Sequence, residues 1–282
     1  MRVLIAGDTH GNAGAVEYKA KIAQRLGCER MFIVGDFGLW PGYEGVQYLD
    51  DVSNAAREYN IQVIALPGNH EDHPQWVKWF DLAPLDQHGF AIIRSNLRLT
   101  KKVHPFKMGG RRFYVCGGAV SIDKQWRVKG KSWWEEEEFT EDDLRSVEKY
   151  KGPAIDYLLT HDCSDYTQWG FRIKPDMESQ ANRQRIDRAI KALRPRFHFH
   201  GHMHSRYEWL NTRSHGLRET AFGTDESEWN GAATKTYGLE CDYDKDSFVI
   251  LDTGADNKKP DNEDKVYWPT EAVMAFDPAF AS

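Results

Sequence analysis

Five short blocks of histidine, aspartate and asparagine contain the residue types that bind divalent metals in sites where a metal-activated water attacks a phosphate. They are Asp8-Thr9-His10, Gly35-Asp36, Gly68-Asn69-His70-Glu71, His161 and Gly201-His202-Met203-His204. Two ions that act together lie about 3.5 to 4 Å apart and share one carboxylate. A single aspartate or asparagine is more often a turn or capping residue than a ligand. Five such blocks in one chain reverse that expectation and indicate a dinuclear metal site.

The elements that must position these blocks are short apolar runs, because each block directly follows one. We expect strands at residues 3–6, 31–34, 61–66, 155–160 and 197–199, and helices at residues 15–26, 46–59 and 182–193. Strands that alternate with helices build a parallel sheet, whose carboxyl ends form the usual ligand edge. We also expect His202 and His204 to continue an extended strand, where the alternation period of two places both rings on one face.

The remaining pattern is richer in β-structure. It predicts strands at residues 90–93, 97–103, 112–116, 206–210 and 248–251. The acidic stretch 135–143 is typical of a solvated helix start, where negative charge suits the helix dipole. The chain from about residue 254 is rich in Asp, Lys and Pro and is expected to be a surface extension or partly disordered.

Taken in order, the five blocks resemble the signature of the calcineurin-like metallophosphoesterases, which reads D-x-H, G-D, G-N-H-[DE], H and G-H-x-H. Any one block is a weak signal, but the ordered set is specific and covers residues 8–204. The resemblance implies an α/β fold, a four-layer αββα sandwich of two mixed β-sheets flanked by helices. It also implies one domain over residues 1–254, with a subtype-specific insertion at 89–151 and a C-terminal extension at 255–282.

The resemblance further implies a role for each block. Two ligand sets share Asp36 as the bridge: one ion is held by Asp8, His10, Asp36 and His204, and the other by Asp36, Asn69, His161 and His202. His70 is implied as the catalytic group, which stabilises the transition state or protonates the leaving oxygen. A hydroxide held between the metals attacks phosphorus in line. Mixed nitrogen and oxygen ligation leaves the two divalent ions open among manganese, iron, zinc and nickel.

Departures from the signature bear on the subtype. The Ser/Thr protein phosphatases of this family extend the second block to G-D-x-x-D-R-G and place an arginine after G-N-H-E. Here residues 35–40 read GDFGLW, and Asp72 follows Glu71. The sequence therefore disfavours a protein phosphatase and leaves a phosphodiesterase acting on a small nucleotide or cyclic nucleotide as the preferred interpretation.

The segment 117–138 is the candidate for substrate selection. Arg127 is predicted to contact a phosphate from a loop over the metal cleft. The alternative is that Trp133 and Trp134 anchor this loop in the core while Arg127 pairs with a local carboxylate. Trp40 and Trp76 follow the second and third blocks, so each is either a wall for a nucleobase or a buried packing residue.

Three other functions stay open. A nuclease would use a basic groove formed by Arg94, Arg98, Lys101, Lys102, Lys107, Arg111 and Arg112. A phosphomonoesterase and a non-catalytic scaffold of the same fold are less favoured. The scaffold reading requires missing ligands or a missing active-site histidine, whereas Asn69, His70 and His204 are all present.

Composition bears on the binding partners and the cellular location of the protein. The 282 residues carry 37 Lys+Arg against 43 Asp+Glu, so a net charge of −6 gives no general attraction to nucleic acid or anionic membrane. The apolar run at residues 3–6 suits a strand better than a signal peptide, and no run approaches a membrane span. We expect a cytoplasmic protein whose partner is a small phosphoester, a nucleotide or RNA. Its widely spaced cysteines, Cys28, Cys116, Cys163 and Cys241, suggest neither a thiolate zinc site nor a disulfide framework.

Overall fold

The first β-sheet of the computed structural model combines strands from the N-terminal hundred residues with two strands from the C-terminal part of the chain. The structure describes residues 1–165, 176–211, 233–254 and 264–276. The strands of this sheet, in spatial order, are β13 (Lys265–Tyr267), β12 (Phe248–Asp252), β1 (Arg2–Ala6), β2 (Arg30–Val34), β3 (Gln62–Leu66), β5 (Leu97–Leu99) and β4 (Ala91–Arg94). Strands β1, β2, β3 and β5 run parallel, so their carboxyl ends meet at one edge.

The second sheet lies face to face with the first. Its spatial order is β10 (Tyr207–Asn211), β11 (Thr234–Gly238), β9 (Phe197–His200), β8 (Tyr157–Thr160), β7 (Arg111–Cys116) and β6 (Val103–Met108). The four central strands run parallel to one another, while β10 and β6 pair antiparallel at the two edges. Both sheets are therefore mixed, as expected.

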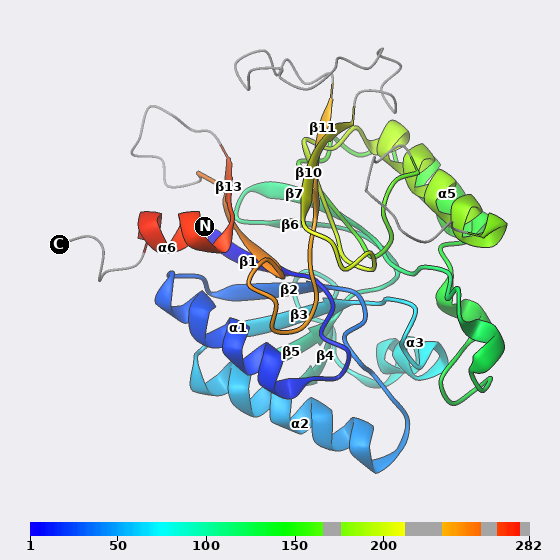
Figure 1. Ribbon diagram of the computed structural model, residues 1–282, viewed down its shortest axis with the longest axis horizontal. Coiled ribbons are helices and arrows are strands. Elements are labelled where there is room, and N and C mark those ends of the chain that lie inside the picture. Colours follow the sequence, from blue (N-terminus) through cyan, green and yellow to red (C-terminus); the bar gives the residue numbers. More distant parts are fainter. Residues whose placement is uncertain (166–175, 212–232, 255–263, 277–282) are drawn as a thin grey trace.

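Helices cover the outer face of each sheet (Figure 1). The first sheet packs on α1 (Ala13–Arg25), α2 (Gly42–Glu58), α3 (His73–Leu82) and α6 (Pro269–Phe276). The second packs on α4 (Glu141–Glu148) and α5 (Met177–Leu193). With the apolar layer between the sheets, three cores separate four layers, so the predicted αββα fold is confirmed.

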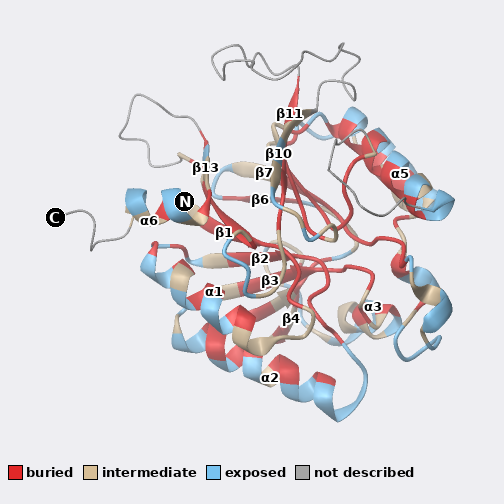
Figure 2. Ribbon diagram, in the orientation of Figure 1, coloured by how far each residue is buried: buried red, intermediate tan, exposed pale blue. Residues whose placement is uncertain are grey.

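Alternation along the strands explains why both faces of each sheet are buried. In β1, Val3 and Ile5 point into the layer between the sheets, while Leu4 points to the helices. Phe32 and Phe113 meet across that layer with ring centroids 5.8 Å apart. Figure 2 shows the strands buried and the exposed residues confined mainly to the outer surfaces of the helices. Burying each such side chain contributes about 1.5–3 kcal/mol.

Several expected boundaries differ from the structure. The single strand expected at 97–103 is two strands, β5 and β6, which belong to different sheets. The region 89–151, expected to carry the subtype-specific insertion, supplies strands β4 to β7 of the two sheets. Only residues 117–140, with the short 3₁₀ helices Lys124–Trp126 and Glu135–Glu137, leave the framework.

The C-terminal chain also differs from expectation. Within the stretch expected to be a surface extension, β13 pairs with β12 and α6 packs on the first core through the fully buried Ala272. Trp268 is 3% exposed and joins the layer between the sheets. Apolar residues at these positions give this stretch a buried face, although its composition is polar overall. Residues 255–263 and 277–282 of the expected extension lie outside the described chain.

Candidate metal centre

All five sequence blocks come together where the carboxyl ends of strands from both sheets meet. Asp8 and Asp36 follow β1 and β2, and Asn69 follows β3. The loop after β1 is fixed to the loop after β2 by backbone bonds, including His10 N–H to the Asp36 carbonyl at 2.8 Å. The second sheet brings His161 after β8, and His202 and His204 after β9. The candidate ligands therefore belong to several distant parts of the sequence that the sandwich joins.

Asp36 lies at the middle of this cluster. Its Oδ1 accepts hydrogen bonds from the backbone N–H groups of Asn69 and His70, both at 2.9 Å. The same oxygen lies 3.2 Å from His161 Nε2, while Oδ2 lies 3.8 Å from His10 Nε2. Its two oxygens thus face two different groups of nitrogen donors, which is the geometry that a shared carboxylate requires.

The inner set of donors consists of Asp36, Asn69, His161 and His202. One donor atom from each of Asp36, His161 and His202 lies within 4.8 Å of the other two. His161 is fully buried, and its Nδ1 lies 2.9 Å from the Val34 carbonyl oxygen. Both of these partners are oxygen acceptors, so Nδ1 donates to the Val34 carbonyl and Nε2 donates to Asn69 Oδ1 at 2.8 Å, and a bound ion would replace the Nε2 proton. The fold therefore fixes the direction of this ring, with Nε2 turned toward the other candidate ligands.

The outer set consists of Asp8, His10 and His204, with Asp36 shared. Asp8, His10 and Asp36 place one donor atom each within 4.8 Å of one another. Asp8 is fully buried, and its Oδ2 lies 2.8 Å from His204 Nε2. The imidazoles are more open than His161, since the side chains of His10 and His204 are 28% and 43% exposed.

The charges of the cluster fit bound cations. Among the described residues, the basic groups within 4.0 Å of the Asp8 and Asp36 carboxylates are all imidazoles. Although burial alone would lower it, the charge of Asp36 raises the pKa of His161 to about 10. The hydrogen bond with Asp8 raises the pKa of His204 to about 11. Two buried carboxylates thus draw positive charge into the cluster, a demand that divalent ions meet.

The backbone at this centre is unusual. Seven non-glycine residues have positive φ in the described ranges, and five of them belong to or contact the cluster: His10, Asp36, His202, His204 and Asp242. Such conformations are uncommon and cluster where the surrounding structure enforces them at functional sites. The expectation of an extended His-x-His strand is therefore wrong. Strand β9 ends at His200, and a left-handed turn rather than strand alternation presents the two rings.

Steric contacts explain why glycine occupies two positions in these blocks. A Cβ atom on Gly201 would lie 2.0 Å from Asp8 Oδ1, and one on Gly35 would lie 2.1 Å from His161 Nδ1. Both distances are far below van der Waals contact. Each glycine therefore lets a candidate ligand from another strand lie directly against the backbone.

Comparison with known proteins agrees with this geometry. The family description "Calcineurin-like phosphoesterase" matches residues 1–206, which is most of the chain. The chain belongs to the calcineurin-like phosphoesterase family. Members of this family use dinuclear metal centres, and the Asp/His clusters of this chain are consistent with one. A search of the curated proteins gave no match.

Solved structures similar to this calcineurin-like phosphoesterase support the fold. The protein TT1561 of Thermus thermophilus is 12% identical with a TM-score of 0.51, covering 94% of this chain and 97% of that one. A dimetal phosphatase from Danio rerio is also 12% identical, with a TM-score of 0.50, covering 89% of this chain and 92% of that one.

In the described residues of our chain, no helix has the length and apolar character needed to cross a bilayer.

Arg127 of this calcineurin-like phosphoesterase reaches the cluster through His70. Its guanidinium nitrogens Nη1 and Nη2 lie 3.0 Å and 2.6 Å from the two ring nitrogens of His70, and Nε pairs with Asp123 at 2.8 Å. Burial, reinforced by the charge of Arg127, lowers the pKa of His70. The neutral ring accepts at one nitrogen only, so one of the two contacts is a hydrogen bond in any one tautomer. Arg127 thus pairs with a local carboxylate, as one sequence alternative expects, and it also faces His70, while its contact with a phosphate stays a prediction.

The two tryptophans suggested as walls have different positions. Trp76 is 2% exposed and donates its indole N–H to the Thr100 carbonyl, so it is a packing residue. Trp40 is 36% exposed and donates to the His70 carbonyl at 2.9 Å. A Cβ on Gly11 would lie 2.5 Å from the Trp40 ring, which shows that this ring lies directly over the loop after β1.

Sequence reasoning missed a buried polar chain behind Asn69. Asn69 Nδ2 donates to Ser121 Oγ at 2.9 Å, and this hydroxyl donates to Glu137 Oε2 at 2.7 Å. Burial raises the pKa of Glu137, which is 3% exposed. The acidic stretch 135–138 is therefore not a solvated helix start: α4 begins later, at Glu141, with a capping box between Thr140 and Asp143. The sequence contains no local sign that one of four consecutive glutamates is buried.

Glu71 supports the other side of Asp36. Its carboxylate accepts backbone hydrogen bonds from Phe37, Gly38 and Leu39 at 2.7 to 3.1 Å. Burial and the charge of Asp36 raise the pKa of Glu71 to about 7, while the three N–H donors oppose that rise. Glu71 therefore acts on the cluster by holding the loop that follows Asp36.

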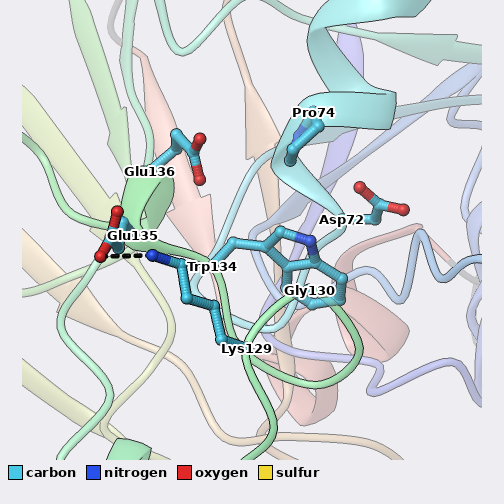
Figure 3. A pocket seen from close by; sticks show the side chains of 7 residues that line it. All are labelled: Asp72, Pro74, Lys129, Gly130, Trp134, Glu135 and Glu136. Atoms are coloured by element: carbon cyan, nitrogen blue, oxygen red, sulfur yellow. Dashed lines mark ion pairs between the residues drawn. The ribbon is translucent and has the colours of Figure 1, made fainter.

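A hollow of about 380 Å³ lies between the start of α3 and the loop that carries Arg127. Figure 3 shows Trp134 at its centre, Asp72 and Pro74 on one side, and the Lys129–Glu135 ion pair on the other. None of the candidate metal ligands lines this hollow. It is thus a feature of the loop and separate from the metal cluster.

Proposed function

We propose that this metal-dependent phosphoesterase hydrolyses a small phosphodiester by in-line displacement at phosphorus, with a nucleotide or cyclic nucleotide as substrate. The observation that carries the proposal is the position of Asp36. It is common to two clusters of metal-ligating atoms, and His70 Nε2 lies 3.8 Å from its Oδ2. A phosphate placed beside the shared carboxylate would therefore contact both ligand sets and His70.

The residues that would hold the ions are the inner set (Asp36, Asn69, His161 and His202) and the outer set (Asp8, His10, His204 and Asp36). When bound, two divalent ions supply an activated water and neutralise charge on the phosphoryl oxygens. The protein's own contribution is to fix the donors, and the buried contacts of Asp36 and His161 support it.

His70 and Arg127 would act on the phosphate itself. The guanidinium is held on one side by Asp123 and faces His70 on the other. A phosphoryl oxygen that binds between them would receive hydrogen bonds from a cation and an imidazole. His70 would then stabilise the transition state or pass a proton to the leaving oxygen.

Trp40 supports a nucleoside substrate. Its ring is partly exposed and is fixed to His70 by a hydrogen bond, so it lies beside the proposed phosphate position. A base that stacks on an aromatic ring gains about 1–3 kcal/mol. A diester with a nucleoside on one side would use both Trp40 and the metal centre.

The basic stretch does not support a nuclease. Arg94 pairs with Asp50, Arg98 with Asp86, and Arg111 with Asp264. Lys102 donates to the carbonyls of Glu136 and Glu138. These four basic groups are engaged in contacts within the fold, so the groove expected for nucleic acid is not favoured.

Two substrates with one leaving group test the proposal. With manganese added, thymidine 5′-(p-nitrophenyl) phosphate should be hydrolysed with a kcat/KM at least about tenfold above methyl p-nitrophenyl phosphate, because only the former stacks a base. Trp40→Ala should remove most of that ratio, whereas Tyr43→Ala, which changes an 80% exposed ring on α2, should not. Equal rates in the wild type, or faster hydrolysis of the monoester p-nitrophenyl phosphate, would contradict the proposal.

A second experiment addresses His70. His70→Asn should keep its bound metal and folded spectrum but lose about 10²–10⁴-fold in kcat. If His70 protonates the leaving oxygen, the loss should be greater for 2′,3′- and 3′,5′-cyclic nucleotides, whose leaving alkoxides need a proton, than for nitrophenyl esters. Equal losses would assign it to transition-state stabilisation. Full activity would remove it from the mechanism.

A further inference from the structure

A turn beyond the part of the chain that matches the family lies against the outer set. The family match ends at residue 206, and this turn connects β11 to β12. Strand β11 runs parallel to β9, so its carboxyl end arrives beside His202 and His204. The turn is anchored on two sides: Leu239 N–H donates to the His200 carbonyl at 3.0 Å, and Asp242 N–H donates to the Asp8 carbonyl at 2.8 Å.

The turn brings a thiol to the two open imidazoles. Cys241 Sγ and one ring nitrogen each from His10 and His204 lie within 4.8 Å of one another. The cysteine is a half-buried free thiol, whereas the other three cysteines are buried. A thiol and two imidazoles at this spacing form a donor group for a borderline or soft divalent ion.

The next residue fixes the ring of His10. Asp242 Oδ2 lies 3.1 Å from His10 Nδ1, so that nitrogen carries the proton and donates it to the carboxylate. His10 Nε2 is left to face Asp8 and Asp36, at 3.8 Å from a carboxylate oxygen of each. Carboxylates commonly hold metal-binding histidines in this way.

A buried lysine on α1 anchors the turn. Lys19 of α1 is fully buried, and its ammonium donates to the Asp242 carbonyl. Asp242 has a φ of +46°, an uncommon conformation that the surrounding contacts must enforce. Three separate contacts therefore direct the Cys241–Asp242 pair at the outer set.

We propose that Cys241 is a thiolate ligand of the ion held by the outer set, and that Asp242 is a positioning residue for His10. The consequence is selectivity: a thiolate makes this position prefer zinc, cobalt or iron(II) to manganese or magnesium, whereas the inner set lacks sulfur. Binding the ion releases the thiol proton to solvent. This inference rests on the metal centre of the proposed function and is independent of the substrate.

Cobalt tests the ligand without turnover. Wild-type protein loaded with two equivalents of Co²⁺ should show near-ultraviolet thiolate-to-cobalt charge-transfer absorption. Cys241→Ser should lose this absorption and bind Zn²⁺ about 10- to 100-fold more weakly, while Mn²⁺ affinity changes far less. Cys28→Ala, a change in the helix-side core, should keep the absorption. Asp242→Asn should keep it too, with about 10- to 100-fold weaker affinity.

Alkylation of the wild-type protein tests the same ligand without any variant. Iodoacetamide should modify Cys241 in metal-free protein, and Zn²⁺ should protect it, as read by peptide mass spectrometry. The three buried cysteines serve as internal controls that stay unmodified in both states. A cobalt-loaded protein without charge transfer, or Cys241 alkylated equally with and without zinc, overturns the proposal. Phosphodiester hydrolysis that persists in such a protein would leave the proposed function intact.

Discussion

The two candidate ligand sets differ in how the protein encloses them. In the inner set, His161 is fully buried and both of its ring nitrogens have protein partners. In the outer set, His10 and His204 are 28% and 43% exposed along their side chains. Strand ends and motif glycines hold one buried ligand in each set, His161 against Gly35 and Asp8 against Gly201. The more open imidazole of His10 is also held by the turn between β11 and β12, through Asp242.

From this difference we predict that the proposed dinuclear centre has one permanent and one exchangeable ion. A donor set that is buried and already oriented binds with little reorganisation and exchanges its ion slowly. A set that is open to solvent responds to the concentration and identity of the metals around it. We therefore expect the inner ion to stay through dialysis and the outer ion to be the one that exchanges.

Removing one histidine from each set distinguishes the two sets by their response to added metal. His161→Ala should reduce kcat by about 10³-fold, because it removes an inner ligand and with it electrostatic stabilisation of the transition state. Added metal should not restore activity, since no solvent-facing group can replace this buried ring. His204→Ala should lose activity at micromolar manganese and regain most of it at millimolar manganese, by mass action. Full rescue of both variants, or of neither, would contradict the proposed difference between the inner and outer sets.

Arg127 should affect catalysis without affecting either set. Arg127→Ala is expected to lower kcat/KM by about 10- to 100-fold, since a cationic hydrogen-bond donor to the phosphate contributes about 1.5–3 kcal/mol. Arg127→Lys should recover only part of the loss, because a lysine lacks the planar fork. Metal content should stay at the wild-type value in both variants. Arg145→Ala on α4, whose side chain is 55% exposed and paired with Asp142, is the matched control and should be neutral.

Substitution of Glu71 should have the smallest effect of the three, and this effect should be on the stability of the protein. Glu71→Gln replaces one accepting oxygen with an NH₂ group that faces backbone N–H donors. We expect the free energy of unfolding to fall by about 1–3 kcal/mol, measured by urea denaturation of metal-free protein. Glu17→Gln on the exposed face of α1 should change it little. An unchanged midpoint for Glu71→Gln would show that the loop after Asp36 does not depend on this carboxylate.

The sequence predicted that the candidate ligands lie at strand ends, because the signals for strand ends are local. An apolar run followed by Asp36 or Asn69 indicates a strand end, and parallel strand ends meet at one edge of a sheet. The order of the blocks supplied the rest through the family resemblance. The sequence did not predict how His202 and His204 are presented, because a left-handed backbone at a non-glycine residue depends on tertiary contacts.

The supporting residues were beyond sequence reasoning for the same physical reason. Cys241 reaches His10 only because β11 pairs with β9 and β12 pairs with β1, and no spacing in the chain encodes these two pairings. Glu137 is distinguished from its acidic neighbours only by its contact with Ser121. Arg127 was singled out, but its pairing with both His70 and Asp123 emerged from the folded loop.

The most direct test of the two-ion centre is to count metals by equilibrium dialysis and elemental analysis. The wild type should bind two divalent ions per chain. Asp36→Asn should weaken both sites together and abolish phosphoesterase activity, because Asp36 faces both sets. Asp252→Asn, which changes a partly exposed carboxylate that pairs with Arg2 and accepts the Gly254 N–H, should still bind two. A wild type that binds one ion at saturation, or an Asp36→Asn variant that binds two with unchanged affinity, would contradict the shared-carboxylate centre.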